Sequence, residues 1–188
     1  MATGPLARRR AVITGGGRGI GRAIALRLAD LGADVAVLAR TREQVVRVAQ
    51  EATGRGVRGV GIPADLTTYP ACRTAVEGAR DALGGVDILV NNAGWTLTTP
   101  FLEEDDGYWR RVVDTNLWGV IFCSRVALEW MAEHDGGAIV NVASDAGRVG
   151  TSGEAVYSAA KGGVIALTRS LAREMAARNV RINCVCPG

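Results

Sequence analysis

Six short apolar runs alternate with longer helical patterns along almost the whole chain. The runs occupy residues 11–14, 34–39, 57–62, 86–90, 138–143 and 180–185. Most of them lack alternation of apolar and polar residues, so we expect strands buried on both faces of a parallel sheet. The helical patterns extend to about residue 31, begin again at residue 41, and fill 70–83, 107–133 and 155–177. This order predicts a doubly wound α/β sheet in three layers.

Length, charge and cysteine spacing limit the class of protein. The 188 residues suit one domain spanning 1–188, because a chain of this length buries about 70% of its unfolded surface. No apolar run approaches the ~20 residues of a membrane span and no signal peptide is recognisable, so we expect a cytoplasmic protein that binds no membrane. The net charge of +3 does not indicate nucleic-acid binding. The cysteines lack zinc spacing, so no metal is expected, and Cys184 and Cys186 are interpreted as buried thiols.

A tyrosine and a lysine lie four residues apart in the last helical segment. Tyr157 and Lys161 therefore share a helix face and can project into one pocket. A free tyrosine has a pKa near 10, too high for a proton shuttle at neutral pH. A cation about 4 Å away, at an effective dielectric of about 20, supplies the roughly 4 kcal/mol needed to lower that pKa by about 3 units. Ser144, 13 residues before Tyr157, can meet the phenol at the carboxyl edge of the sheet. The alternative is a chance pair on a helix.

A glycine-rich segment connects the first apolar run to the first helical segment. It has the pattern Thr14-Gly15-x-x-x-Gly19-x-Gly21. At such a turn the backbone can approach a pyrophosphate, and the helix N-terminus attracts its charge. The pattern departs from G-x-G-x-x-G, because Ile20 stands at the sixth position counted from Gly15. We predict a dinucleotide site; the alternative is a glycine-rich turn without a ligand.

Together with other residues in the same order, these motifs resemble the short-chain dehydrogenase/reductase family. The matching residues are TGGGRGIG at 14–21, Asp65, NNAG at 91–94, Asn116, Ser144, Tyr157-x-x-x-Lys161 and Pro187-Gly188. The resemblance covers the chain from about Arg9, and the glycine spacing is similar to the branch that reduces free carbonyls. It implies a Rossmann-type sheet with strand order 3-2-1-4-5-6, and interconversion of a carbonyl and a secondary alcohol by hydride transfer.

The resemblance also implies roles for individual residues. Tyr157 would be the general acid/base, Lys161 would lower its pKa and hydrogen-bond the nicotinamide ribose, and Ser144 would polarise the substrate carbonyl. Asn116 would hold a water in a proton relay to Lys161, and Asp65 would contact the adenine ring. The full set of implied cofactor-binding residues is Gly15, Arg18, Gly19, Ile20, Gly21, Arg40, Asp65, Leu66, Asn92, Ala93, Gly94, Tyr157, Lys161, Pro187 and Gly188.

The end of the second apolar run bears on the choice between NADP and NAD. NAD enzymes place an acidic residue there, whereas a nearby arginine accommodates the phosphate of NADP. This chain has Arg40 at that point, and Arg18 in the glycine loop is a second possible phosphate ligand. Asp34 opens the strand and so faces the other edge, and Glu43 is expected at a helix N-terminus for the dipole alone. We expect NADP rather than NAD; the alternative is that both arginines are only solvated charges.

The substrate is less constrained than the cofactor. The stretches VASDAGRVGTSGEAVY and NNAGW are similar to those of 2-hydroxycyclohexanecarboxyl-CoA dehydrogenases, and the general build resembles 3-oxoacyl-(acyl carrier protein) reductases. Both imply a small carbonyl or hydroxy substrate carried as a CoA or acyl-carrier thioester. Arg40 disfavours the CoA dehydrogenases, which are expected to use NAD. Arg148 either meets a carrier phosphate or faces water, and His134 is expected to be exposed near a turn.

Family members usually continue beyond the Pro-Gly motif with a seventh strand, and this chain stops at Gly188. We therefore expect a C-terminally truncated sheet whose sixth strand is an exposed edge. The two long helices would pack against their mates in a homodimer or homotetramer of the full-length form. Three hypotheses stay open: an NADP-dependent 3-oxoacyl thioester reductase, an NAD-dependent 2-hydroxycyclohexanecarboxyl-CoA-type dehydrogenase, and a truncated cofactor-binding module without turnover.

Overall fold

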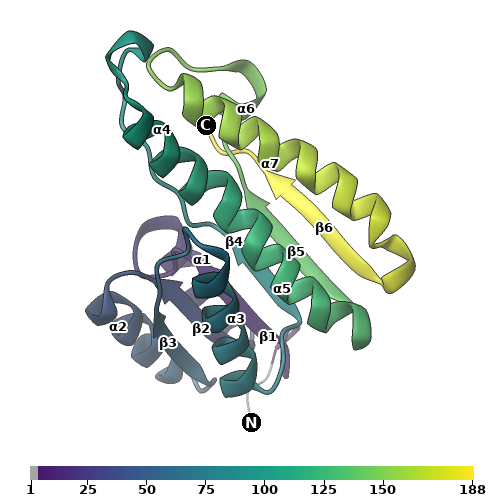
Figure 1. Ribbon diagram of the computed structural model, residues 1–188. Helices are drawn as coiled ribbons and strands as arrows, with labels where there is room; N and C mark the ends of the chain where they lie inside the picture. The colour runs from purple at the N-terminus through teal and green to yellow at the C-terminus, as the bar shows by residue number, and fades with distance from the viewer. Residues whose placement is uncertain (1–3) are drawn as a thin grey trace.

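The computed structural model describes residues 4–188, and its strands form one parallel sheet. The strands are β1 (Arg10–Thr14), β2 (Asp34–Ala39), β3 (Gly59–Pro63), β4 (Ile88–Asn91), β5 (Gly137–Val142) and β6 (Val180–Val185). They lie in the order β3-β2-β1-β4-β5-β6 (Figure 1). The chain winds outward from β1 in one direction and from β4 in the other. The predicted doubly wound sheet and strand order are confirmed, and β6 is an edge strand as expected.

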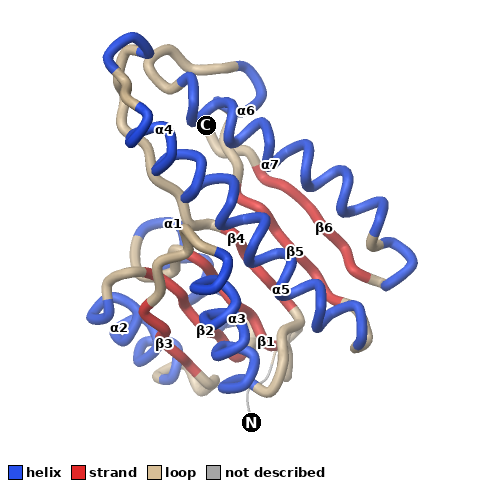
Figure 2. The backbone as a smooth tube through the Cα atoms, viewed as in Figure 1, coloured by secondary structure: helices blue, strands red, loops and turns tan. Residues whose placement is uncertain are grey.

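Helices cover both faces of this sheet (Figure 2). The α-helices are α1 (Gly19–Asp30), α2 (Arg42–Thr53), α3 (Tyr69–Leu83), α4 (Asp106–Val113), α5 (Gly119–Glu133), α6 (Ala146–Val149) and α7 (Ala155–Glu174). The short turns η1 (Phe101–Glu103) and η3 (Ala176–Arg178) are 3₁₀, and η2 (Asp114–Trp118) is π-helical. None of the helices within residues 4–188 is long and apolar enough to cross a membrane.

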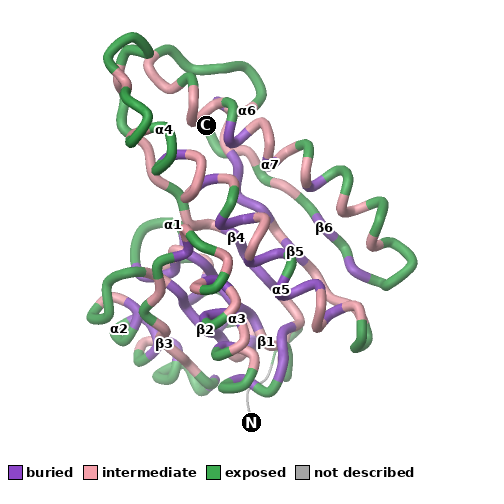
Figure 3. The backbone as a smooth tube through the Cα atoms, viewed as in Figure 1, coloured by how far each residue is buried: buried purple, intermediate pink, exposed green. Residues whose placement is uncertain are grey.

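Alternate residues of the central strands β1, β2 and β4 belong to two separate apolar clusters. Val12 and Leu89 pack with residues of α3 and α5, whereas Ile13 and Val90 pack with residues of α1 and α2. Successive side chains of a strand point to opposite faces, so continuous apolar runs are required where both faces are covered. Figure 3 shows the resulting buried strands at the centre of the molecule. Full burial of each such side chain stabilises the fold by about 1.5–3 kcal/mol.

The long helix predicted over 107–133 is instead two α-helices joined by the π-helical turn η2. Within this turn the Asn116 amide nitrogen donates to the carbonyl of Val112, 2.8 Å away and four residues earlier. A side chain thus satisfies a helical carbonyl. Short π-helical insertions of this kind occur mostly at functional sites. Periodicity could not predict the turn, because a single extra residue hardly changes the apolar pattern.

Smaller expectations were also wrong. Thr41 lies at the N-cap of α2 but its side chain makes no capping hydrogen bond, and Gln44 lines a cleft instead of completing a capping box. Cys184 and Cys186 are half-buried rather than buried, because β6 has a neighbouring strand on one side only. The four-residue helix α6 was not predicted. His134 is exposed, as expected, and stacks on Trp130 with ring centroids 3.6 Å apart.

Candidate cofactor cleft and active site

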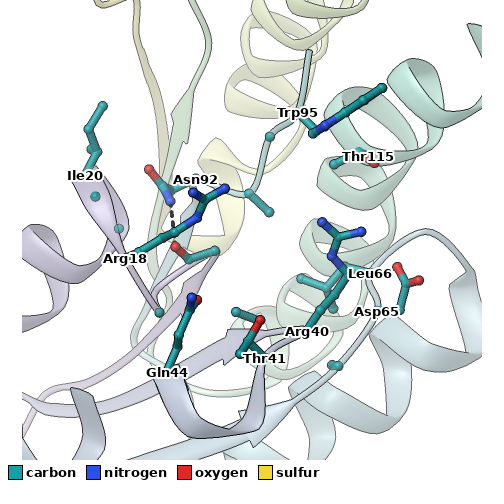
Figure 4. Close-up of a pocket in the computed structure, with 18 of the residues that line it drawn as sticks. Arg18, Ile20, Arg40, Thr41, Gln44, Asp65, Leu66, Asn92, Trp95 and Thr115 are labelled. Atoms are coloured by element: carbon teal, nitrogen blue, oxygen red, sulfur yellow. Dashed lines mark hydrogen bonds between the residues drawn. The ribbon is translucent and has the colours of Figure 1, made fainter. Parts of the chain in front are cut away.

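A cleft of about 550 Å³ opens at the carboxyl ends of β1, β2 and β4 (Figure 4). The chain reverses its winding between β1 and β4, and ligands of open α/β sheets bind at such a switch point. Of the residues predicted to bind the cofactor, the cleft is lined by Gly15, Arg18, Gly19, Ile20, Gly21, Arg40, Asp65, Leu66, Asn92, Ala93 and Gly94. Most of the predicted cofactor-binding residues therefore line one cleft, although they come from four separate segments of the chain.

The glycine turn between β1 and α1 fits a phosphate group. Gly15 and Gly19 have φ angles of +64° and +53°, which favour glycine. A Cβ at Gly21 would collide with the carbonyl of Gly15, whereas a Cβ at Gly19 would meet nothing within 4 Å. No side chain caps α1 and its first turn has no acidic residue. The N–H groups and positive dipole end of α1 therefore remain available to an anion.

Two arginines and one aspartate set the charge of this cleft. Arg18 and Arg40 extend into it from different loops (Figure 4), and neither is paired with a carboxylate within residues 4–188. Asp65 also lines the cleft, and it accepts a hydrogen bond from the backbone of Thr67 at 3.2 Å. Asp34 begins β2, at the opposite end from the cleft, and accepts from the backbone of Arg58. The end of β2, where an acidic residue would favour NAD, therefore has no acidic residue in this chain.

The NNAG segment anchors the glycine turn as well as lining the cleft. Thr14 Oγ1 accepts hydrogen bonds from the backbone N–H groups of Asn92 and Ala93, each at 3.0 Å. The Asn92 side chain donates to the carbonyls of Thr14 and Gly15, at 3.1 and 3.3 Å. These bonds tie the ends of β1 and β4 together. The amide of Asn92 therefore holds the phosphate-binding turn in place.

Asn116 is fully buried and clamps the backbone of Trp95. Its amide nitrogen donates to the Trp95 carbonyl at 2.6 Å, and its Oδ1 accepts from the Trp95 N–H at 3.2 Å. The Trp95 ring lies between the Arg111 guanidinium, whose central carbon is 3.7 Å from the ring centroid, and the Tyr108 ring at 5.6 Å. Asn116 thus uses its amide on backbone groups, so a water-holding role toward Lys161 stays a prediction.

Ser144, Tyr157 and Lys161 meet at the carboxyl end of β5. Lys161 Nζ donates to the carbonyl of Val142, the last residue of β5, at 2.8 Å. Its ammonium group lies 5.7 Å from the centroid of the Tyr157 ring. The hydroxyl of Ser144 lies near enough to the Tyr157 phenol to lower its pKa, and it accepts a hydrogen bond from the backbone of Ala146 at 3.2 Å. The long helix α7 and the strand β5 thus bring the three predicted groups together.

Gly94 connects this group to the cofactor cleft. A Cβ placed on Gly94 would lie 3.0 Å from Asn116 Oδ1 and 3.6 Å from Lys161 Nζ. Because Gly94 also lines the cleft, the ammonium of Lys161 is within reach of whatever the cleft binds. Tyr157 and Lys161 themselves do not line the cleft. Pro187 and Gly188 also lie outside it, and the Pro187 carbonyl accepts from the backbone of Asp145 at 2.9 Å.

The pKa values of the pair differ from the sequence-based expectation. Burial raises the pKa of the Tyr157 phenol, while the nearby Ser144 hydroxyl opposes this shift and the charge of Glu154 adds to it. Lys161 is 3% exposed, and burial lowers its pKa from 10.5 to about 8. The expected lowering of the Tyr157 pKa is therefore wrong for this structure, because burial is the largest influence on the phenol and Lys161 is not among the groups that shift its pKa.

Sequence reasoning missed several residues of the cleft. They are Gly17, Ala39, Thr41, Gln44, Ala64, Thr67 and Thr115. Gln44 follows Arg40 by one helical turn, and Thr115 directly precedes Asn116, so nearness to a predicted residue was the available signal. No cluster of metal-ligating side chains occurs among the described residues.

Fold and cleft together define the class of protein. A switch-point cleft with a glycine turn, an uncapped helix N-terminus and a positive wall fits a dinucleotide, and the adjacent tyrosine and lysine fit proton transfer. The residues present therefore suit a nicotinamide dinucleotide, and the class is an oxidoreductase.

Comparison with known proteins identifies the family. Residues 9–188 match the family model described as short chain dehydrogenase. The 3-oxoacyl-[acyl-carrier-protein] reductase FabG of Staphylococcus aureus (strain Mu50) is 41% identical over 179 residues, covering 95% of this chain and 73% of that protein. The reductase of the same name from Chlamydia pneumoniae is 36% identical over 180 residues, covering 96% and 73%. The chain therefore belongs to the short-chain dehydrogenase family, and the protein is an NAD(P)-dependent oxidoreductase.

Solved structures agree with this assignment. A protein from Sinorhizobium meliloti 1021, assigned by its description to the short-chain alcohol dehydrogenases, superposes with a TM-score of 0.95 at 43% identity. The match covers 97% of this chain and 73% of that one. NAD⁺-bound xylitol dehydrogenase superposes with a TM-score of 0.94 at 32% identity, covering 98% and 71%.

Proposed function

We propose that the protein is an NADPH-dependent reductase of 3-oxoacyl thioesters, with Tyr157 as general acid. The observation that carries this proposal is the meeting of Ser144, Tyr157 and Lys161 at the end of β5, beside the cleft that Gly94 connects to them. The substrate class is supported by relatives named 3-oxoacyl-[acyl-carrier-protein] reductase.

Different groups around the substrate carbonyl would deliver the hydride, donate the proton and stabilise the developing negative charge. The bound nicotinamide would supply the hydride to the carbonyl carbon. The Tyr157 phenol would donate its proton to the carbonyl oxygen, and the raised pKa of Tyr157 keeps that proton on the phenol at neutral pH. The Ser144 hydroxyl would donate a hydrogen bond to the same oxygen, stabilising the charge that develops there. The product is the secondary alcohol.

Lys161 and Asn116 would support this proton transfer. With a pKa of about 8, Lys161 is mostly protonated at pH 7 and can also release a proton without a large energetic cost. It would hydrogen-bond the nicotinamide ribose near Gly94 and return a proton to Tyr157. Asn116 would position Trp95 and Gly94 and, as the resemblance suggests, hold a water toward Lys161.

The choice of NADPH over NADH rests on Arg18 and Arg40. Both guanidinium groups reach the cleft without a carboxylate partner among residues 4–188, and both suit the 2′-phosphate of the adenosine ribose. Asp65 would contact the adenine ring on the other side. A hydrogen bond to a charged group contributes about 1.5–3 kcal/mol, so one arginine accounts for at least about a tenfold preference.

We also propose a homodimer or homotetramer that works in the cytoplasm on a CoA or acyl-carrier thioester. An apolar groove between α5 and α7, lined by Ile121, Leu128, Leu167, Leu171 and Met175, supports packing of these helices against a second copy.

The test measures oxidation of NADPH and of NADH with acetoacetyl-CoA. We expect turnover with NADPH that falls about 100- to 10,000-fold in Tyr157→Phe, while NADPH still binds. Arg40→Ser should raise the KM for NADPH about tenfold and leave the KM for NADH unchanged. Arg42→Ser is the matched control, since Arg42 is exposed in the same turn but does not line the cleft.

Other results would change the proposal in defined ways. Turnover with NADH alone would refute the role of Arg40 and favour an NAD-dependent dehydrogenase of the 2-hydroxycyclohexanecarboxyl-CoA type. Saturable NADPH binding without turnover, and without an effect of Tyr157→Phe, would indicate a cofactor-binding module.

A further inference from the structure

Two cysteines lie on the same side of the chain at the end of β6. Cys184 belongs to β6 and Cys186 follows it by two residues, so their side chains leave the extended backbone in the same direction. Both pack against the apolar cluster of Val120, Ala143 and Val164, and both are half-buried. The Sγ atom of Cys184 also lies 3.8 Å from the carbonyl of Val185, the residue between the two cysteines. The two cysteines form a contiguous dithiol at the edge of the sheet.

This dithiol adjoins the catalytic group. Val185, which lies between the two cysteines, is paired in the sheet with Val142, and the Val142 carbonyl accepts the hydrogen bond from Lys161 Nζ. The backbone N–H of Ala143, the residue before Ser144, donates to the carbonyl of Val185 at 2.8 Å. A group attached to the two sulfur atoms would therefore sit beside Lys161.

The chain contains a second pair of neighbouring thiols that serves as an internal comparison. Cys72 of α3 and Cys123 of α5 lie close enough for each thiol to influence the pKa of the other. Both are 0% exposed and belong to the main apolar cluster beneath the helices. Reagents in solution therefore reach Cys184 and Cys186 but not Cys72 and Cys123 in the folded protein.

We propose that Cys184 and Cys186 form a vicinal dithiol site that binds a thiophilic trivalent arsenical across both sulfur atoms and thereby disturbs Lys161. Two thiols at adjacent positions on one side of the chain suit a soft acceptor, which replaces their protons. An intrachain disulfide is disfavoured, because residues two apart in an extended chain have Cα atoms about 6.6–7 Å apart, at or beyond the upper limit of disulfide geometry. Burial raises the pKa of Cys184, which keeps the thiol protonated and slow to oxidise.

The reaction with phenylarsine oxide balances without an oxidant. Each sulfur forms one bond to arsenic, and the arsenic–oxygen bond breaks. The two thiol protons leave with that oxygen as one water molecule. Arsenic stays trivalent, and the product is a cyclic dithioarsenite that joins residues 184 and 186. Neither sulfur is oxidised, so a competing dithiol reverses the reaction by exchange.

Intact-protein mass spectrometry with stoichiometric phenylarsine oxide and excess 2-mercaptoethanol tests the site. We expect one phenylarsenic unit per chain, removed by 2,3-dimercaptopropanol but not by the monothiol, since a single cysteine cannot form the ring. Cys184→Ala and Cys186→Ala should each abolish the adduct, and Cys72→Ala should keep it. Urea midpoints of all three variants, and labelling of the remaining accessible thiol by iodoacetamide, establish that they are folded.

Specific results of the same experiment would refute the proposed dithiol site. No adduct on the wild-type chain, an adduct that survives Cys186→Ala, or an adduct lost in Cys72→Ala would each refute the site. The link to Lys161 is tested by NADPH fluorescence titration, which needs no turnover: the adduct should weaken NADPH binding at least tenfold in the wild-type chain. An affinity that stays within twofold would refute the link.

Discussion

Replacing Lys161 by methionine measures how much the burial of a charged ammonium group lowers the free energy of unfolding. Lys161 is 3% exposed, and its pKa falls from 10.5 in solution to about 8. Each pKa unit corresponds to about 1.4 kcal/mol, so at pH 7 the buried charge destabilises the fold by about 3 kcal/mol. Methionine has a similar length and no charge. It would also leave the Val142 carbonyl without its hydrogen bond, at a cost of about 1 kcal/mol.

The net expectation is a variant about 2 kcal/mol more stable than the wild type at pH 7. Its advantage should shrink as the pH rises, because wild-type Lys161 loses its proton in the folded state above about pH 8 while the unfolded chain keeps it until 10.5. Between pH 7 and pH 9 the difference should narrow by about 1.4 kcal/mol. Urea unfolding of both proteins at the two pH values measures this directly.

The chain offers an independent check, since Lys161 is its only lysine. Incorporation of ε-¹³C-lysine gives one side-chain resonance, and its titration reports the pKa without assignment. A pKa near 10.5, or a Lys161→Met variant whose stability differs from the wild type by the same amount at pH 7 and pH 9, would refute the argument that burial sets the protonation of Lys161.

Three further substitutions test other parts of the structure. Asn116→Ala should destabilise the fold by about 2–4 kcal/mol in urea, because three backbone groups lose their partner; a loss below about 1 kcal/mol would contradict the clamp. Gly21→Ala should weaken NADPH binding at least tenfold by fluorescence titration, because its Cβ has no room, whereas Gly54→Ala, at the end of α2, should leave binding unchanged. Asp87→Asn should lower stability by about 1–2 kcal/mol at pH 7, because hydrogen bonds and charge from Arg10 outweigh burial and lower the pKa of that carboxyl. This loss should fade as the pH falls below 3.8, and a loss that is independent of pH would refute it.

The glycine turn and the NNAG segment show which structural features a local sequence pattern can predict and which it cannot. Gly15, Gly19 and Gly21 are required by φ angles and by contacts within a few residues, so their spacing already indicated a phosphate-binding turn. The contribution of Asn92 to that turn depends on hydrogen bonds to residues 77 and 78 positions earlier. Such a partner is not visible in a local pattern.

For the Tyr157–Lys161 pair, the sequence predicted where the two side chains lie but not the direction of their pKa shifts. Helical spacing alone placed both groups on one face of α7. The direction of the pKa shifts was not predictable. It depends on how completely β5, β6 and η2 cover Lys161, which is set by packing between distant segments.

The amino-acid sequence by itself determined the order of strands and helices, the two-sided burial of the sheet and the residue types at its carboxyl edge, because these follow from local periodicity and from the handedness of crossover connections. Only the tertiary structure decided the π-helical turn at Asn116 and its clamp on Trp95. It also decided the protonation of Lys161. These features depend on desolvation and on hydrogen bonds between segments far apart in the chain, and neither is encoded in the spacing of neighbouring residues.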